Sequence, residues 1–436
     1  MQRFLYKKLL EWKGSKHRKP LLLQGARQTG KTWLVTEFGK HEYLHFVYLN
    51  FEETPDLVQL FKEGLSPDKI IENIGLYMGY RISHEGTLLF FDEIQSAPKA
   101  LTSLKYFQEK APEYHIIAAG SLLGVSIGKT SPFPVGKVSF MNLFPMNFTE
   151  YLMAAGEEQI CKKLLEMKAP KQFPEPIHDK LLGHLKIFMF LGGMPEAVAD
   201  YLQNKDVQRV REIQKDILRA YERDFSKYTE KLQAVKTSEV WNSLPNQLSR
   251  ENKKFKYSDV RKNSRASSYE LTMEWLSKAG LIYKVENISV PKLPLSAYAD
   301  AGKFKVYLHD TGLLGAMLNL SSTLILEPTT LFSEFNGAFT ENLVACELIS
   351  HGHEKLYYWT SGNAAEVDFI IAKNGKILPI EVKSGLNKNK KSLQSYADKY
   401  KPDMVYRLSP RNFIQSGNFT NLPLYASNLL AANEQV

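Results

Sequence analysis

A segment of eight residues near the start of the chain has the residue types and spacing of a phosphate-binding loop. It fits the pattern GxxxxGK followed by Ser or Thr, in which glycines let backbone amide groups face phosphate oxygens. The lysine adds a positive charge at the β and γ phosphates, and the final hydroxyl group can reach Mg²⁺. We therefore predict that ATP is bound by Gly25, Ala26, Arg27, Gln28, Thr29, Gly30, Lys31 and Thr32.

Two carboxylates follow a strongly apolar segment further along the chain. Residues 88–91 are apolar and would form a buried strand, and Asp92 and Glu93 come directly after them. A carboxylate at such a strand end can hold Mg²⁺, and a neighbouring one can orient and deprotonate the attacking water. We assign the metal to Asp92 with Thr32 and the catalytic role to Glu93. An acidic turn after a core strand is the structural alternative.

The elements that would position these residues alternate along the first third of the chain. Short apolar segments separated by helix or turn patterns are typical of a parallel sheet covered by helices. Ser121 follows the fourth segment and is either a polar sensor of the γ phosphate or an ordinary turn residue. The expected strands are 21–24, 46–50, 87–91, 115–119 and 137–141.

The middle of the chain is mainly helical. Between residues 148 and 228 the pattern favours helices, and the Gly-Gly-Met-Pro segment at 192–195 should end one helix and begin the next. Residues 235–320 combine helices with a short extended segment at 281–288, an order that resembles a winged helix.

Near the C-terminus, the dipeptide Asn-Gly at 374–375 separates two alternating segments and predicts a two-residue type I′ hairpin turn. This turn fixes the pairing of the strands and places Asp368 opposite Glu381. Directly opposed carboxylates repel each other unless a cation lies between them. Pro379 lacks an amide donor and could shift this register.

A divalent metal ion would resolve that repulsion. Asp368 and Glu381 would be its ligands, with the carbonyl of Val382 as a third, and Lys383 would stabilise the charge that develops on a phosphate. Glu341 on an expected helix at 336–350 could add a ligand. We therefore predict a second Mg²⁺ or Mn²⁺ site. The alternative is a half-exposed hairpin with solvated acids, an ion pair across it and no metal.

Composition places the chain among ordinary globular proteins. It has 436 residues, of which 44% are hydrophobic and 24% charged, so it can bury several cores and is neither disordered nor collagenous. Its two cysteines are far apart, which argues against a disulfide framework and a cysteine-rich zinc site. No apolar leader or membrane-length apolar run occurs. We expect a cytoplasmic protein without a membrane partner, and its sequence leaves homo-oligomers open.

The excess of positive charge is concentrated in two windows. The net charge is +9, to which residues 251–265 contribute +4 and residues 383–401 contribute +5. Nucleic acid is the anionic partner that we predict for these windows, although lysines that only increase solubility explain them equally well. Glu270 and Glu274 on the helix expected at 267–278 would repel phosphate, which disfavours groove recognition by that helix.

Taken together, the segments resemble the bacterial and archaeal predicted AAA+ ATPases in which a winged helix and a nuclease-like domain of unknown function follow the ATPase domain. The resemblance implies an additional-strand P-loop (ASCE) fold, MgATP binding and hydrolysis. It also implies that the helical Glu, the Asp and the ExK motif belong to a PD-(D/E)xK core. The segments that carry it are GARQTGKT, LLFFDEIQ, IIAAGSLL, VGKVSFMNLFPMNFTEYL, FLGGMPEAV and EVDFIIAKNGKILPIEVKSG.

The chain departs from that family at one position. Gly136-Lys137 stands where the family is expected to have Gly-Arg before the last strand of the ATPase sheet. A lysine lacks the planar, bidentate fork with which an arginine holds phosphate. The identity of an arginine finger is therefore open, and Arg219 and Arg223 are further candidates.

The sequence thus predicts an α/β protein that couples an ATPase to a nuclease-like, DNA-binding domain. The alternative is a nucleotide-dependent switch or scaffold whose nuclease-like domain is inactive and only binds a partner or nucleic acid. The expected domains are a P-loop AAA+ core at 1–155, a helical lid at 156–230, a winged-helix-like domain at 231–325 and a restriction-endonuclease-like domain at 326–436.

Overall fold

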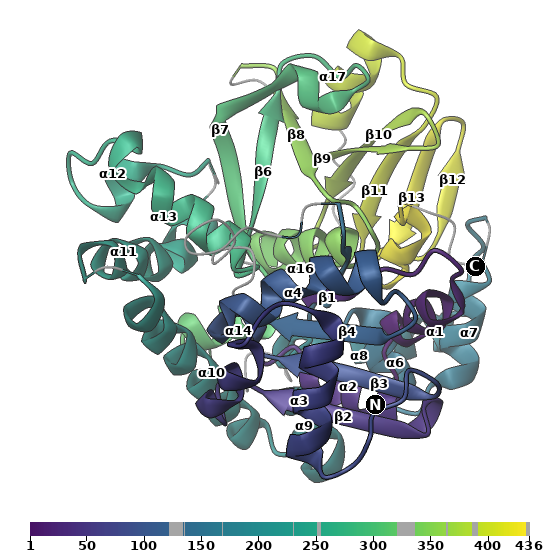
Figure 1. Cartoon of the computed structure of the whole chain (residues 1–436). Helices are drawn as coiled ribbons and strands as arrows, with labels where there is room; N and C mark the ends of the chain where they lie inside the picture. Colours follow the sequence, from purple (N-terminus) through teal and green to yellow (C-terminus); the bar gives the residue numbers. More distant parts are fainter. Residues whose placement is uncertain are drawn as a thin grey trace. The chain divides into compact units, whose positions relative to one another are not determined.

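The chain, shown as a computed structural model in Figure 1, divides into two compact units. The first contains residues 1–144 and 278–280, and the second contains the described residues of 145–277 and 281–436. The described residues are 1–121, 134, 136–167, 169–229, 231–250, 254–320, 336–362, 365–385 and 391–432.

Within its described residues, the first unit is built on a parallel sheet with the strand order β2-β3-β4-β1-β5. Every expected strand of this unit is present, with ends that shift by at most two residues. Strand β4 lies between β1 and β3, where the family resemblance implies an additional strand. The strands are Leu21–Gln24 (β1), His45–Asn50 (β2), Thr87–Asp92 (β3), His115–Gly120 (β4) and Ser139–Asn142 (β5).

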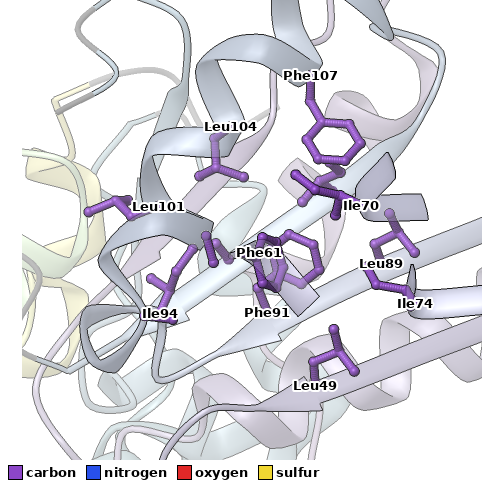
Figure 2. Close-up of a cluster of buried hydrophobic side chains, with 14 of the residues drawn as sticks. Leu49, Phe61, Ile70, Ile74, Leu89, Phe91, Ile94, Leu101, Leu104 and Phe107 are labelled. Carbon is purple, nitrogen blue, oxygen red and sulfur yellow. The ribbon is translucent and has the colours of Figure 1, made fainter. Parts of the chain in front are cut away.

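Helices cover this sheet because its strands are apolar on both faces. In β1 to β4, alternate residues enter different hydrophobic clusters, so that Leu89 and Phe91 pack on one face and Leu88 and Phe90 on the other. Figure 2 shows the first face, where Ile70 and other apolar side chains of the flanking helices meet the strands. The helical segments are Leu5–Gly14 (α1), Lys31–Glu42 (α2), Pro55–Phe61 (η1), Pro67–Met78 (α3), Ile94–Ser96 (η2) and Pro98–Lys110 (α4).

The second unit begins with a series of helices. The predicted interruption is confirmed: one helix ends at Leu191, Gly192 follows with a φ of 69°, and the next helix begins at Pro195. Asp310 accepts a hydrogen bond from the amide of Gly193 at 2.6 Å, which ties this interruption to a later helix. The helices are Phe148–Ala154 (α6), Glu158–Leu165 (α7), Glu175–Leu191 (α8), Pro195–Asn204 (α9), Val207–Tyr228 (α10), Lys231–Leu248 (α11), Tyr257–Val260 (α12), Ala266–Lys278 (α13) and Thr311–Met317 (α14).

A mixed sheet with the order β12-β13-β11-β10-β9-β8-β6-β7 forms the rest of the second unit's described part. Helix α16 (Asn336–Ser350) packs against strands β7, β8 and β10 of this sheet. The other helical segments are η3 (Leu295–Tyr298), α17 (Lys391–Tyr400) and η4 (Leu424–Leu430). The strands are Ile282–Ile288 (β6), Ala299–Leu308 (β7), Leu356–Thr360 (β8), Glu366–Lys373 (β9), Lys376–Val382 (β10), Val405–Ser409 (β11), Ile414–Ser416 (β12) and Phe419–Pro423 (β13).

This sheet crosses the expected boundary at residue 325. The hairpin β6–β7 was assigned to a winged-helix-like domain, but β6 pairs in parallel with β8 over Val285–Ile288 and Leu356–Trp359. This pairing provides hydrogen-bond partners for the backbone groups on one side of β8, and β9 pairs with its other side. The winged helix and the four-domain division therefore stay predictions, and the structure places their third and fourth parts on a common sheet.

The predicted register of the C-terminal hairpin is confirmed as far as the pair Ile380 and Phe369, one position before the expected pair of Asp368 and Glu381. Asn374 and Gly375 have positive φ values of 49° and 73°, as a type I′ turn requires. The pairing runs from Lys376 opposite Lys373 to Ile380 opposite Phe369, and Pro379 sits within it without a shift.

Candidate nucleotide-binding site and the C-terminal carboxylates

The phosphate-binding loop connects the end of β1 with the start of α2. Gly25 has a φ of 153°, and a Cβ atom there would lie 2.2 Å from the carbonyl oxygen of Leu143. Gly30 precedes α2 with a φ of 90°, in the left-handed region that favours glycine. Both glycines of the motif are thus required by backbone conformation or by close packing.

Lys31 lies folded back into the loop that precedes it. Its Nζ atom donates hydrogen bonds to the carbonyl oxygens of Gly25 at 2.9 Å and Ala26 at 2.8 Å. Burial lowers the pKa of Lys31 from 10.5 to about 8, although the charges of Glu93 and Asp92 oppose this shift. The ammonium group is therefore held inside the loop where a phosphate could take over its contacts.

The oxygen atoms at the end of β3 fit a magnesium ion. The hydroxyl group of Thr32 donates to Asp92 Oδ2 at 2.6 Å, and the hydroxyl group of Tyr48 donates to the same oxygen at 3.2 Å. Asp92 is buried, and this burial raises the pKa of its carboxyl group. Hard oxygen donors of this kind are those that Mg²⁺ prefers, so Thr32 and Asp92 could hold it.

Glu93 and Ser121 lie at the same edge of the sheet, where the parallel strands have their carboxyl ends. The backbone of Glu93 has a φ of 50°, and its amide donates to Asp92 Oδ1 at 3.0 Å. The side-chain amide of Gln95 donates a hydrogen bond to Glu93 Oε2. Ser121 directly follows β4, between the strands that carry the loop and the two acids. Its sensor role stays a prediction.

Sequence reasoning missed Arg3, which supports the loop from outside the motif. Its guanidinium group is buried and donates to the carbonyl oxygens of Thr29 at 2.9 Å and Phe144 at 2.6 Å. No motif or spacing marks an arginine near the start of a chain as a partner of a phosphate loop.

Replacing Arg3 with alanine should weaken ATP binding by about 10-fold, because hydrogen bonds from charged groups contribute about 1.5–3 kcal/mol and the loop would lose its brace. Isothermal titration calorimetry with MgATP measures the effect. Replacement of the exposed Lys8 with alanine is the matched control and should leave the dissociation constant unchanged. Equal affinities of the two variants would contradict the bracing role.

The lowered pKa of Lys31 predicts a pH dependence of ATP binding. Phosphate binding favours the protonated lysine, whose fraction in the free protein falls above its pKa of about 8. The dissociation constant of ATP should therefore be constant below that pH and rise toward about 10-fold per pH unit above it. Titrations from about pH 7 to pH 9 measure this, and a Lys31→Met variant, which binds weakly, should show a flat profile.

Lys137 lies away from the phosphate loop. It precedes β5 and therefore lies near the amino ends of the parallel strands, whereas the loop follows the carboxyl end of β1. It forms an ion pair with Glu109 at 3.0 Å. In the second unit, Arg219 is exposed and pairs with Asp216 at 2.8 Å, and Arg223 is exposed. The identity of an arginine finger stays open.

The C-terminal acids do meet, but around a lysine that the sequence did not indicate. Lys305 on β7 is fully buried, and its Nζ atom lies 2.5 Å from Glu366 Oε1. Glu341 Oε2 on α16 and Asp368 Oδ1 on β9 both lie 3.8 Å from the same Nζ atom. We call Glu341, Glu366 and Asp368 the carboxylate cluster.

Glu381 is neutralised separately. Arg407, its neighbour on β11, donates to Glu381 Oε2 at 3.0 Å, and Lys383 lies 3.1 Å from Oε1. The other oxygen of Asp368, Oδ2, accepts a hydrogen bond from the amide of Val382 at 2.8 Å. Both oxygens of Glu381 are therefore engaged by cations of the chain itself.

These contacts do not fit the expected divalent metal ion. Lys305, Arg407 and Lys383 contact these acids and compensate their charge. Within the described residues, no group of three or more His, Cys, Asp or Glu side chains is arranged to hold a metal ion. The alternative ion pair across the hairpin, between Glu366 and Lys383, is not formed either, since each has another partner.

The two basic windows are described in part. Lys253, Lys388 and Lys390 lie outside the described residues. Of the others, Lys399 is exposed, and its Nζ atom lies 5.1 Å from the centre of the ring of Tyr400, the next residue of α17. The acidic residues expected on the outer face of α13 are exposed there. Nucleic-acid binding by these windows stays a prediction.

The sheet order, the phosphate loop and the two strand-end acids define the first unit as a P-loop ATPase domain of the AAA type. Comparison with known families agrees, because residues 17–152 match the model described as "AAA domain". Residues 183–324 match "Domain of unknown function (DUF8612)", and residues 336–426 match "Domain of unknown function (DUF4143)". Each match covers less than half of the chain.

Solved structures with a similar course of the chain are remote. The Walker-type ATPase PABY2304 of Pyrococcus abyssi is 16% identical with a TM-score of 0.45, and the match covers 72% of this chain and 94% of that one. The Orc1 protein of Aeropyrum pernix in complex with DNA is 13% identical with a TM-score of 0.27, covering 73% and 93%. No curated protein matches the sequence. No helix in the described ranges has the length and apolarity to cross a membrane.

Proposed function

We propose that the chain binds MgATP at the loop of the first unit and hydrolyses it with Glu93 as the general base. The observation that carries this proposal is the 2.6 Å contact between Thr32 and Asp92, which brings the loop and the strand-end acid together. Glu93 follows Asp92 directly, so both acids lie at the edge of the sheet that carries the loop.

Each residue has a separate task in this proposal. Mg²⁺, held by Thr32 and Asp92, would supply charge stabilisation on the phosphates. Lys31 exchanges its loop carbonyls for phosphate oxygens and neutralises part of their charge. Glu93 accepts a proton from the attacking water, and Gln95 orients its carboxylate through the hydrogen bond at Oε2.

Calorimetry with MgATP tests this proposal on the full chain. Wild-type protein should bind ATP, and the Lys31→Ala variant should lose binding, because the buried ammonium group is the cation of the loop. The Lys8→Ala variant, which removes an exposed lysine, should bind as the wild type does. Indifference of the wild type to ATP would reject the proposal.

For the C-terminal part we propose a binding role, for a protein partner or nucleic acid, rather than nuclease activity. The supporting observation is that Arg407 and Lys383 engage both oxygens of Glu381, the acid expected to hold the metal. Cleavage assays on DNA and RNA with Mg²⁺ or Mn²⁺ should show equal residual activity for the wild type and the Asp368→Ala variant. Cleavage that this substitution removes would restore the nuclease hypothesis.

A further inference from the structure

A buried lysine among three carboxylates is the least expected feature of the second unit. The side chain of Lys305 has no exposed surface, whereas the side chain of Glu366 is 36% exposed and that of Asp368 is 13% exposed. The desolvation of a buried ammonium group costs on the order of several kcal/mol unless opposite charges compensate it. The position of Lys305 therefore requires the carboxylate cluster, in the same way that the cluster requires a cation.

The surroundings of Lys305 favour its charged form. Burial by itself would lower the pKa of Lys305, but Glu341, Asp368 and Glu366 together raise it above its ordinary value. Its ammonium group also lies 5.2 Å from the centre of the Tyr358 ring, a cation–π contact. The hydroxyl group of Tyr307, two residues along β7, donates to Glu341 Oε2 at 2.9 Å.

The lysine also joins elements that are distant in the sequence. It lies on β7, and its acidic partners lie on α16 and β9, while β8 and β6 separate β9 from β7 in the sheet. A metal ion at this place would hold α16 and the hairpin β9–β10 together. The lysine does so with a covalently attached charge and extends the connection to β7.

We propose that the Lys305 ammonium group takes the place of a divalent metal ion in the carboxylate cluster, so that the second unit carries a built-in cation there and binds no Mg²⁺ or Mn²⁺. Removing the ammonium group leaves three carboxylates around a vacated cation position. The three carboxylates, which are not arranged to hold a metal ion around the lysine, can then move together and become a divalent-cation site. This inference does not depend on ATP hydrolysis by the first unit.

Mn²⁺ titration of the full chain without nucleotide tests the inference, with calorimetry and electron paramagnetic resonance as readouts. The Lys305→Ala variant should gain a saturable Mn²⁺ site that the wild type lacks, and Mn²⁺ should raise its Tm. The Lys305→Arg variant, which keeps the charge, should resemble the wild type. The double variant Lys305→Ala/Asp368→Asn should lose the new site. The phosphate loop is the same in all variants, so any Mn²⁺ that binds there contributes equally to each titration.

Two results would overturn the inference. One is a Mn²⁺ site in the wild type that the Asp368→Asn variant lacks, which would show that a metal displaces the lysine. The other is a folded Lys305→Ala protein that gains no site. If Lys305→Ala fails to fold, the comparison of wild type with Asp368→Asn decides alone, because asparagine can still accept the hydrogen bond from Val382.

Discussion

Replacing Glu93 with glutamine is expected to lower the turnover number for ATP by about 10²–10⁴-fold, the usual contribution of a general base. Glutamine has nearly the same shape and can still contact Gln95, but it cannot accept the proton of the attacking water. The loop, Lys31 and Asp92 are unchanged, so the dissociation constant of MgATP should stay within about 2-fold of the wild type. Steady-state phosphate release and calorimetry measure the two quantities.

The matched control is Glu53→Gln, an exposed acid close to the same edge of the sheet. It changes the net charge by the same amount and should leave turnover unaltered. An equal loss in both variants would assign the effect to general electrostatics. Full turnover in the Glu93→Gln variant would remove this residue from the proposed mechanism.

Replacing Arg407 with methionine is expected to destabilise the second unit by about 3–5 kcal/mol, the cost of leaving a buried charge without its partner. Arg407 and Glu381 are both only 3% exposed, and they face each other on neighbouring parallel strands. Methionine fills a similar volume, so the loss reports mainly the buried carboxylate oxygen Oε2 of Glu381, which no longer has its cationic partner. Urea unfolding followed by circular dichroism measures the change.

Lys383 provides the comparison for this prediction because it contacts the same carboxylate from a more exposed position. Its side chain is 37% exposed, so the Lys383→Met variant should lose less than about 1 kcal/mol. The double variant Arg407→Met/Glu381→Leu should recover most of the stability, since no buried charge remains. Similar losses for Arg407→Met and Lys383→Met would show that burial does not decide the strength of these pairs.

The two units differ in how the negative charge of their clustered acidic side chains is compensated. In the first, Thr32 and Asp92 are oxygen donors in contact, without a side-chain cation between them, so a metal ion can join them. In the second, Lys305 already stands among the acids. The first arrangement suits the binding of a nucleotide together with its metal ion. The second suits a permanent group of ion pairs within the fold.

Features that depend on neighbours along the chain could be predicted from the amino-acid sequence. The phosphate loop follows from the spacing of Gly25, Gly30 and Lys31, and the strands of the first unit follow from runs of apolar residues. The turn at Asn374 and Gly375 determined the register of its hairpin, because a two-residue turn leaves no freedom in pairing.

The pairing of buried charges, in contrast, depends on the three-dimensional packing of the chain. Lys305 meets Glu366 after 61 residues, Arg407 meets Glu381 after 26, and Arg3 meets Thr29 after 26. No local pattern encodes such pairs, because a lysine or arginine on a strand looks the same whether its partner is water or a buried carboxylate. Repulsion between opposed carboxylates led to the prediction of a divalent metal ion in the C-terminal hairpin, whereas long-range packing brings the cationic side chains of Lys305 and Arg407 to these acids.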